Sequence, residues 1–243
     1  GGKVRFETTS WTLISLARAE DAADAREAMS RLFETYWPPV YAFIRGRGHS
    51  PQDAEELAQG YFARFFEKKY ARDFRPEVGR FRTFLRASVA HFLANEWDRE
   101  RAKKRGGVHR PLSLDTATAE ERYRLEPVDE LTPETLFERN WAAALLGRCL
   151  ERLHEEERAA GRPERFFTLK PFLVGDGEAV YADAARDLGI SEPAVRVALH
   201  RLRKRFGSVL REEVRHTVAT PADVDSELRW LLSVVRGGRE ERI

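Results

Sequence analysis

The amino-acid sequence predicts an all-α protein with two helical domains joined by an extended acidic linker. Most segments repeat their apolar residues at the spacing of a helix, and the alternating pattern of a strand is nearly absent. Ser50-Pro51 and Thr132-Pro133 each open such a segment with a capping hydroxyl followed by proline, which is typical of a helix start. Residues 107–131 lack periodicity and collect acids, so we expect the linker there.

The chain has 243 residues, enough for one large or two small domains. It carries 42 Lys and Arg against 40 Asp and Glu, a net charge of +2, so its basic clusters reflect segregation of charge. Cys149 is the single cysteine, which excludes an internal disulfide or a cysteine metal cluster and suits a reducing cytoplasm. No apolar stretch has the length of a membrane span and no signal-peptide pattern opens the chain, so we expect a cytoplasmic protein.

The first half is expected to consist of helices around an apolar core. Pro38 and Pro39 should interrupt one of them, because proline lacks the N–H that continues a helix. The expected elements are a short helix over 10–18, a helix over 21–37, a resumed pattern up to Gly46, a helix from Pro51, a loop over 70–80 and a helix over 81–105.

The helix from Pro51 separates its apolar and polar residues onto opposite sides. The polar side consists of Gln52, Asp53, Glu56 and Gln59, and the apolar side of Leu57, Ala58, Tyr61, Phe62, Phe65 and Phe66. Acids in the first turn stabilise a helix through its dipole. The residues alone therefore leave a structural and a functional role for the acids equally open.

The helix over 81–105 combines a polar stripe with a strongly basic end. His91, Asn95 and Asp98 share the stripe, and the basic end consists of Arg99, Arg101, Lys103, Lys104 and Arg105. A basic end also complements the helix dipole, but this density exceeds that need. Two readings remain open: a nucleic-acid surface and an ordinary solvated helix end.

Residues 181–206 predict two short helices joined by a tight turn at Gly189. Ser191 can cap the second helix, and Pro193 is acceptable in its first turn. The second helix carries a run of basic residues with no acid among them: Arg196, His200, Arg201, Arg203, Lys204 and Arg205. A basic second helix after a turn is the arrangement of a DNA major-groove reader. The alternative is an ordinary helical hairpin with a solvated face.

We divide the chain into a first domain over residues 1–106, the acidic linker over 107–131, a second domain over 132–218 and a C-terminal helical extension over 219–243. The linker is either a tether or a segment whose acids mimic phosphates in a groove for nucleic acid. The extension either packs on the domain or offers a face to a partner. Cys149 is expected to be a core residue in the helix from Thr132.

Searches for catalytic patterns find no phosphate loop, no HExxH, no Gly-x-Ser-x-Gly and no paired-cysteine site. The six histidines are scattered. We therefore expect a binding protein that is not an enzyme and that needs neither a metal nor a cofactor.

Taken together, the order of these elements resembles a bacterial RNA polymerase sigma factor of the extracytoplasmic-function (ECF) type, within the sigma-70 family, from about residue 20 to 215. DAEELAQGYFARFF (53–66) is similar to the helix that grips the clamp helices of the polymerase's largest subunit. FRTFLRASVAHFLANEWDRERAKKR (81–105) is similar to the helix that melts and reads the −10 promoter element, and SEPAVRVALHRLRKR (191–205) to the −35 recognition helix. His91 and Asn95 depart from the residues that are common at their positions in the family, so the preferred −10 base does not carry over.

The resemblance implies three groups of site residues. The polymerase contacts would be Asp53, Glu56 and Gln59; the −10 contacts Arg80, Arg82, His91, Asn95 and Arg99; and the −35 contacts Arg196, Val197, His200, Arg201 and Lys204. The implied partners are core RNA polymerase (its clamp helices and flap), promoter DNA, and an anti-sigma factor or protein kinase as regulator, in the cytoplasm at the nucleoid. The alternatives are a stand-alone helix-turn-helix repressor or activator, and an adaptor that retains the fold without binding DNA.

Overall fold

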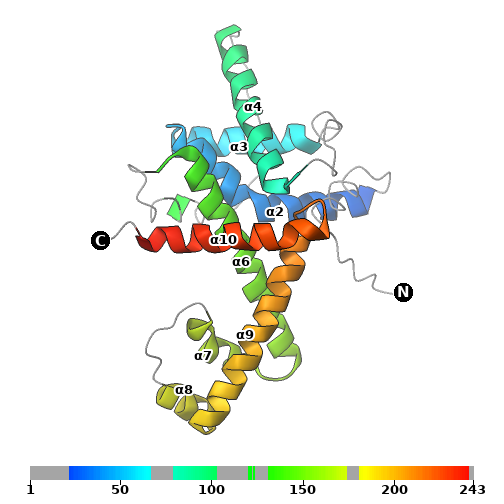
Figure 1. The fold of residues 1–243 in the computed structure, drawn as a ribbon. Coiled ribbons are helices and arrows are strands. Elements are labelled where there is room, and N and C mark those ends of the chain that lie inside the picture. The colour runs from blue at the N-terminus through cyan, green and yellow to red at the C-terminus, as the bar shows by residue number, and fades with distance from the viewer. Residues whose placement is uncertain are drawn as a thin grey trace. The chain divides into compact units, whose positions relative to one another are not determined.

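The computed structural model describes residues 22–66, 79–102, 120–121, 123, 131–173 and 181–240, all of them helical or in turns between helices (Figure 1). The all-α prediction is confirmed, and no strand occurs in these ranges. The helices are α2 (Ala22–Gly46), α3 (Pro51–Phe66), α4 (Phe81–Ala102), α6 (Pro133–Ala159), α7 (Pro163–Leu169), α8 (Tyr181–Leu188), α9 (Glu192–Arg215) and α10 (Val224–Glu240), with short 3₁₀ turns η4 (Lys170–Phe172) and η5 (Pro221–Asp223). The expected helix over 10–18 and loop over 70–80 lie outside the described residues, apart from Gly79 and Arg80.

The predicted starts of α3 and α6 are confirmed. Ser50 Oγ accepts a hydrogen bond from the Asp53 amide at 3.1 Å, and Thr132 Oγ1 accepts one from the Thr135 amide at 3.1 Å. Each hydroxyl satisfies one of the amide groups that a helix start leaves without a helical partner.

The predicted interruption at Pro38 and Pro39 is wrong, because α2 continues through both prolines. Each proline removes one backbone hydrogen bond from the helix and costs about 3 kcal/mol in a helix interior. The residues on either side of the prolines are buried in the core: Tyr36, Trp37, Val40, Tyr41, Phe43 and Ile44. Burying side chains of this size contributes about 1.5–3 kcal/mol each, which exceeds the cost of the two prolines.

The chain folds into two compact units, which are treated separately below. Unit 1 takes the described residues up to Ala144 together with those from Arg215 onward, and unit 2 is Leu145–Val214. This division differs from the boundaries expected at 131/132 and 218/219, because the start of α6 and all of α10 pack within unit 1. The turn η5 and the described part of α10 therefore belong to the packing of unit 1.

Unit 1 is built around aromatic side chains from α2, α3, α4 and the start of α6. Trp141 is almost fully buried and stacks on Tyr36, with ring centroids 4.9 Å apart. Phe81, at the first position of α4, packs against the same two rings at 4.8 Å from Tyr36 and 5.8 Å from Trp141. Trp141 therefore holds the start of α4 against α2.

The described part of the predicted linker contacts α2. Residues 120, 121 and 123 are helical, whereas an extended chain was expected. Glu120 accepts hydrogen bonds from Tyr41 Oη at 2.6 Å and Arg45 Nε at 3.0 Å, and the Arg45 guanidinium lies 4.5 Å from the Tyr123 ring centroid. Burial, together with the Glu120 contact, raises the pKa of Tyr41 above its ordinary value. These contacts attach this part of the linker to unit 1.

Unit 2 has its own small core between α6, α7, α8 and α9. Cys149 lies within it and is fully buried, in keeping with the expected packing role. On the surface of the unit, Arg205 donates two hydrogen bonds to Glu156 at 2.6 and 2.7 Å. Those bonds lower the pKa of Glu156 below its ordinary value. The half-exposed position of this pair limits its contribution to stability.

Cys149 should be inert towards thiol reagents in the folded protein. Burial raises the pKa of its thiol to about 12, so only about one thiol in ten thousand is ionised at pH 8. Because the sequence contains one cysteine, modification by an aromatic disulfide reagent reports on this site alone. We expect negligible reaction in native buffer and complete reaction in denaturant. Rapid stoichiometric reaction of the native protein would contradict the burial of Cys149.

Candidate nucleic-acid interface

Helices α8 and α9 are joined by a tight turn, as predicted. Gly189 adopts a φ of +63°, in the left-handed region that favours glycine, and the Ile190 amide donates to the Ala185 carbonyl at 3.0 Å. Ser191 Oγ accepts a hydrogen bond from the Ala194 amide at 3.4 Å at the start of α9. Small and branched side chains are buried where the two helices meet: Ala184, Ala185, Val195 and Ala198.

One face of α9 presents the predicted −35 residues to solvent. Arg196, Val197, His200, Arg201 and Lys204 are all exposed. Val197 is 51% exposed, an unusual position for a branched apolar side chain among cations. Cations that reach phosphates and guanines, with an apolar side chain that can contact a thymine methyl group, suit a DNA major groove.

Several basic residues of α9 form contacts within unit 2: Arg196 lies 3.9 Å from Glu192 and 5.3 Å from the Tyr181 ring centroid, and two others bind more distant partners. Arg203 donates to the Phe172 carbonyl at 2.8 Å and 3.2 Å, and Arg205 pairs with Glu156. The sequence pattern placed both among the basic residues of this helix and could not separate them from the others, because their partners come from distant segments. Arg203 and Arg205 are therefore engaged within unit 2, and neither is among the predicted −35 residues.

The acidic face of α3 is exposed at its start. Asp53 and Glu56 are exposed, and Gln59 is half-buried. Asp53 accepts a hydrogen bond from the Ser50 hydroxyl at 2.7 Å, and Gln59 donates to Glu55 at 3.3 Å. Asp53 therefore takes part in the helix cap and still offers a carboxylate to solvent beside Glu56.

The polar stripe of α4 also lies at the surface. His91 is exposed and Asn95 is half-buried. Trp97 is 58% exposed on the same helix, a feature that the sequence analysis did not single out. An accessible indole is a platform on which nucleic-acid bases can stack. Arg99 belongs to α4, and its side chain lies outside the described residues.

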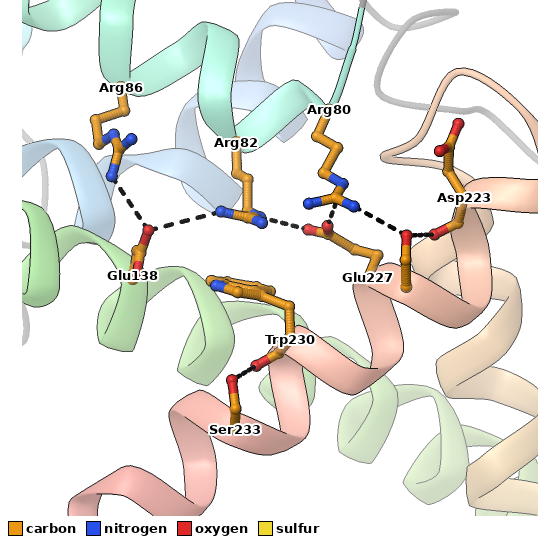
Figure 2. A network of polar contacts seen from close by, with 9 residues as sticks. Arg80, Arg82, Arg86, Glu138, Asp223, Glu227, Trp230 and Ser233 are labelled. Atoms are coloured by element: carbon orange, nitrogen blue, oxygen red, sulfur yellow. Dashed lines mark hydrogen bonds and ion pairs between the residues drawn. The ribbon is translucent and has the colours of Figure 1, made fainter.

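The start of α4 places Arg82 in a buried position. Its side chain is 9% exposed, and its Nε donates to Glu227 Oε1 of α10 at 2.6 Å. Its guanidinium lies 3.6 Å from the centroid of the Trp230 ring, and Nη1 lies 3.6 Å from Glu138 of α6 (Figure 2). Glu138 also accepts a hydrogen bond from Arg86 at 3.1 Å. This burial argues against a direct contact between Arg82 and DNA.

Arg80 lies one residue before α4 and is held from one side. Its Nη2 donates to Ser226 Oγ at 2.9 Å, and Ser226 in turn donates to the Asp223 carbonyl at 2.8 Å (Figure 2). Its Nε lies 3.0 Å from Glu227 Oε2, an oxygen that accepts no hydrogen bond from the described residues. That contact is therefore an ion pair without hydrogen-bond geometry. The Arg80 side chain remains 35% exposed.

Unit 1 thus combines an acid-faced helix with a polar and basic one, and a family comparison bears on the same segment. The family model of Sigma-70 region 2 matches residues 32–103. The match supports a sigma factor of the sigma-70 family. Region 2 implies a role in promoter-directed transcription initiation, with core RNA polymerase and promoter DNA as partners. No curated protein and no solved structure matches the chain.

The matched segment of region 2 contains part of the predicted surfaces. It includes every residue predicted to contact polymerase or the −10 element, and the −35 residues on α9 lie beyond it.

None of the described helices has the length and apolar character needed to cross a membrane.

Proposed function

We propose that the chain is a sigma factor of the ECF type, which brings core RNA polymerase to promoters with −35 and −10 elements and helps to open the −10 region. The observation that carries this proposal is the region 2 match over residues 32–103, in a chain that also has an exposed basic helix behind a tight turn. In this proposal the protein acts by binding, in the cytoplasm, and has no enzymatic activity or cofactor of its own.

In the proposed mechanism, unit 1 joins polymerase and the opened DNA strand. The exposed carboxylates of Asp53 and Glu56, with Gln59, dock on the clamp helices of the largest subunit. The stripe of His91 and Asn95 on α4 contacts bases that leave the duplex. Basic residues at both ends of α4 supply phosphate contacts, which contribute affinity without reading the base sequence.

Unit 2 is proposed to fix the complex upstream, with α8 and α9 acting as a helix-turn-helix. Its α9 enters the major groove of the −35 element, where arginines bind guanine edges and phosphates. Neither DNA contact needs to be strong alone, because two linked sites bound to one polymerase reinforce each other. The acidic segment over 107–131, apart from the part at Glu120 and Tyr123 that contacts α2, is proposed to pass through the polymerase cleft in place of RNA. Unit 2 is proposed to contact the flap. An anti-sigma factor or a protein kinase is the proposed regulator.

The decisive experiment is run-off transcription with core RNA polymerase and a pool of promoter fragments. We expect transcripts that appear only when the protein is added and that share upstream and −10 sequences. Tight binding of a DNA operator by the protein alone, without association with core polymerase, would contradict the proposal and identify a stand-alone repressor or activator. Association with polymerase without any added transcripts would instead indicate an adaptor that does not use DNA.

Replacing Arg196 or Arg201 with alanine should weaken binding to the −35 element by about 1–3 kcal/mol if the side chain makes a bidentate base contact. The measurement is a competition assay between matched and scrambled −35 sequences. A loss that is equal on all sequences would identify a phosphate contact instead. Arg203→Ala is the matched control, because Arg203 donates to the Phe172 carbonyl, and it should change the affinity much less.

A further inference from the structure

The segment after α9 returns to unit 1 and caps the start of α4. The Phe81 amide, one of the donors that a helix start leaves without a helical partner, donates to the Thr217 carbonyl at 2.9 Å. The first turn of α4 contains no acid of its own. The carboxylate of Glu227, which binds Arg80 and Arg82 beside that turn, supplies a negative charge there (Figure 2). The returning segment is well buried at Thr217, Val218, Val224, Glu227 and Leu231.

Arg82 ties three helices together. It extends from α4 between Glu138 of α6 and Glu227 of α10, with the Trp230 ring against its guanidinium. The Glu227 side chain is only 2% exposed. A buried cation that loses its partner strongly destabilises the folded protein. Removal of Glu138 or Glu227 would therefore leave the charge of Arg82 poorly compensated.

Arg80 differs from Arg82 because its side chain is 35% exposed, against 9% for Arg82. Glu227 and Ser226 engage Nε and Nη2, and none of its contacts with the described residues uses Nη1. A guanidinium has five N–H donors in a fixed plane. The hydrogen bond to Ser226 and the ion pair with Glu227 hold the guanidinium in place, and its other N–H donors can then bind a phosphate with little further reorganisation.

We propose that the C-terminal segment from Thr217 to Leu231 completes the DNA-binding unit, and that Glu227 is a positioning residue that holds Arg80 for contact with a phosphate of the promoter strand. This inference rests on the proposed function. Arg82 acts through the same carboxylate as a structural link. The segment lies outside residues 32–103, which the region 2 family model matches.

The opposite role would be a removable cover, in which Glu227 takes the place of a DNA phosphate and α10 must leave before DNA binds. The burial argues against it. Removal of α10 would expose Val224 and Leu231 to water and leave the charge of Arg82 without Glu227. The two roles predict opposite signs for the same substitution, which makes them experimentally distinct.

The test is Glu227→Gln in holoenzyme assembled with core RNA polymerase. The probe is a fluorescein-labelled single-stranded oligonucleotide that carries the non-template −10 strand of a promoter selected in the run-off experiment. If charge alone mattered, removing an acid near the DNA would strengthen binding, because it reduces repulsion of the phosphates. A positioning role instead predicts a weakening of about 3–10-fold and a decrease of about 0.7 in the slope of log affinity against log salt, the value for one phosphate contact on a single strand.

Arg80→Ala should reproduce both effects, and the double variant should be no weaker than either single variant, because the two residues act through one contact. Asp225→Asn is the matched control. It removes the same charge from an exposed position of α10 and should leave the affinity unchanged or slightly higher. Additive losses in the double variant would overturn the positioning role.

Glu227→Gln also removes charge from a buried cluster, so the stability of each variant is measured by chemical denaturation. Ser226→Ala is the second variant, since it removes a hydrogen bond to Arg80 and leaves the Arg82–Glu227 pair in place. We expect a 2–3-fold weakening with an unchanged unfolding midpoint. If Glu227→Gln and Ser226→Ala both bind the strand as tightly as the wild type or more tightly, the positioning role of Glu227 is overturned and the proposed function is unaffected. Failure of the wild-type holoenzyme to bind any selected strand would overturn the proposed function, and the proposal with it.

Discussion

Replacing Trp141 with alanine is expected to lower the free energy of unfolding of unit 1 by about 3–5 kcal/mol. The indole is almost fully buried and contacts aromatic rings from three helices: Tyr36 of α2, Phe81 of α4 and Phe137 of its own helix α6. Truncation would remove those contacts and leave a cavity, because rings held by three helices cannot all move inward to fill it.

Tryptophan fluorescence measures this effect without interference from unit 2. The described tryptophans lie in unit 1, and the sequence from Leu145 to Val214 contains none. The signal during denaturation in urea therefore follows unit 1. Trp97→Ala is the matched control, because that indole is more than half exposed, and it should change the stability by no more than about 0.5 kcal/mol. Similar losses for the two substitutions would contradict the described core.

The helix starts were predictable because their causes are local. The hydroxyl of a capping serine or threonine accepts a hydrogen bond from the amide three residues later, and the next residue is proline. Neither feature needs a partner from a distant part of the chain. Ser50 and Thr132 accordingly cap α3 and α6 where the sequence placed them. The turn at Gly189 is local in the same way, since the conformation with positive φ selects glycine.

The course of α2 was not predictable from local rules. Pro38 and Pro39 would end an isolated helix, and the sequence analysis expected a break there. The helix continues because aromatic and branched side chains on both sides of the prolines are buried against segments distant in the sequence, as for Tyr36 against Trp141. Only the tertiary packing shows that the burial of these side chains outweighs the cost of the two prolines in the helix.

In the candidate sites, too, local sequence rules could not predict contacts with distant segments. Composition marked the basic residues of α9, but the partners that occupy Arg203 and Arg205 come from the preceding helices. The role of Arg82 depends on Glu227, which lies 145 residues later in the chain. Exposure of Asp53 and Glu56, by contrast, follows from helical spacing alone, since both lie opposite the apolar face of α3.

Asp53→Arg combined with Glu56→Arg is expected to abolish association with core RNA polymerase. Both side chains are exposed at the start of α3, on the face proposed to meet the clamp. The double substitution replaces two negative charges with two positive ones, so attraction to a basic surface becomes repulsion. Like charges brought together at an interface cost several kcal/mol. The measurement is gel filtration or fluorescence anisotropy of labelled protein with core polymerase at physiological salt.

The fold of this variant must be tested separately, because Asp53 also belongs to the cap of α3. Ser50 Oγ still accepts the amide hydrogen bond of residue 53 after the substitution, so the loss of stability should stay near 1 kcal/mol. Glu34→Arg with Asp225→Arg is the matched control, since it makes the same charge change at exposed positions of the same unit. If the control binds polymerase and the Asp53 and Glu56 variant does not, the effect belongs to the α3 face. Equal binding of polymerase by the two variants would contradict the proposed clamp contact of the α3 face and the role of Asp53 and Glu56 in it.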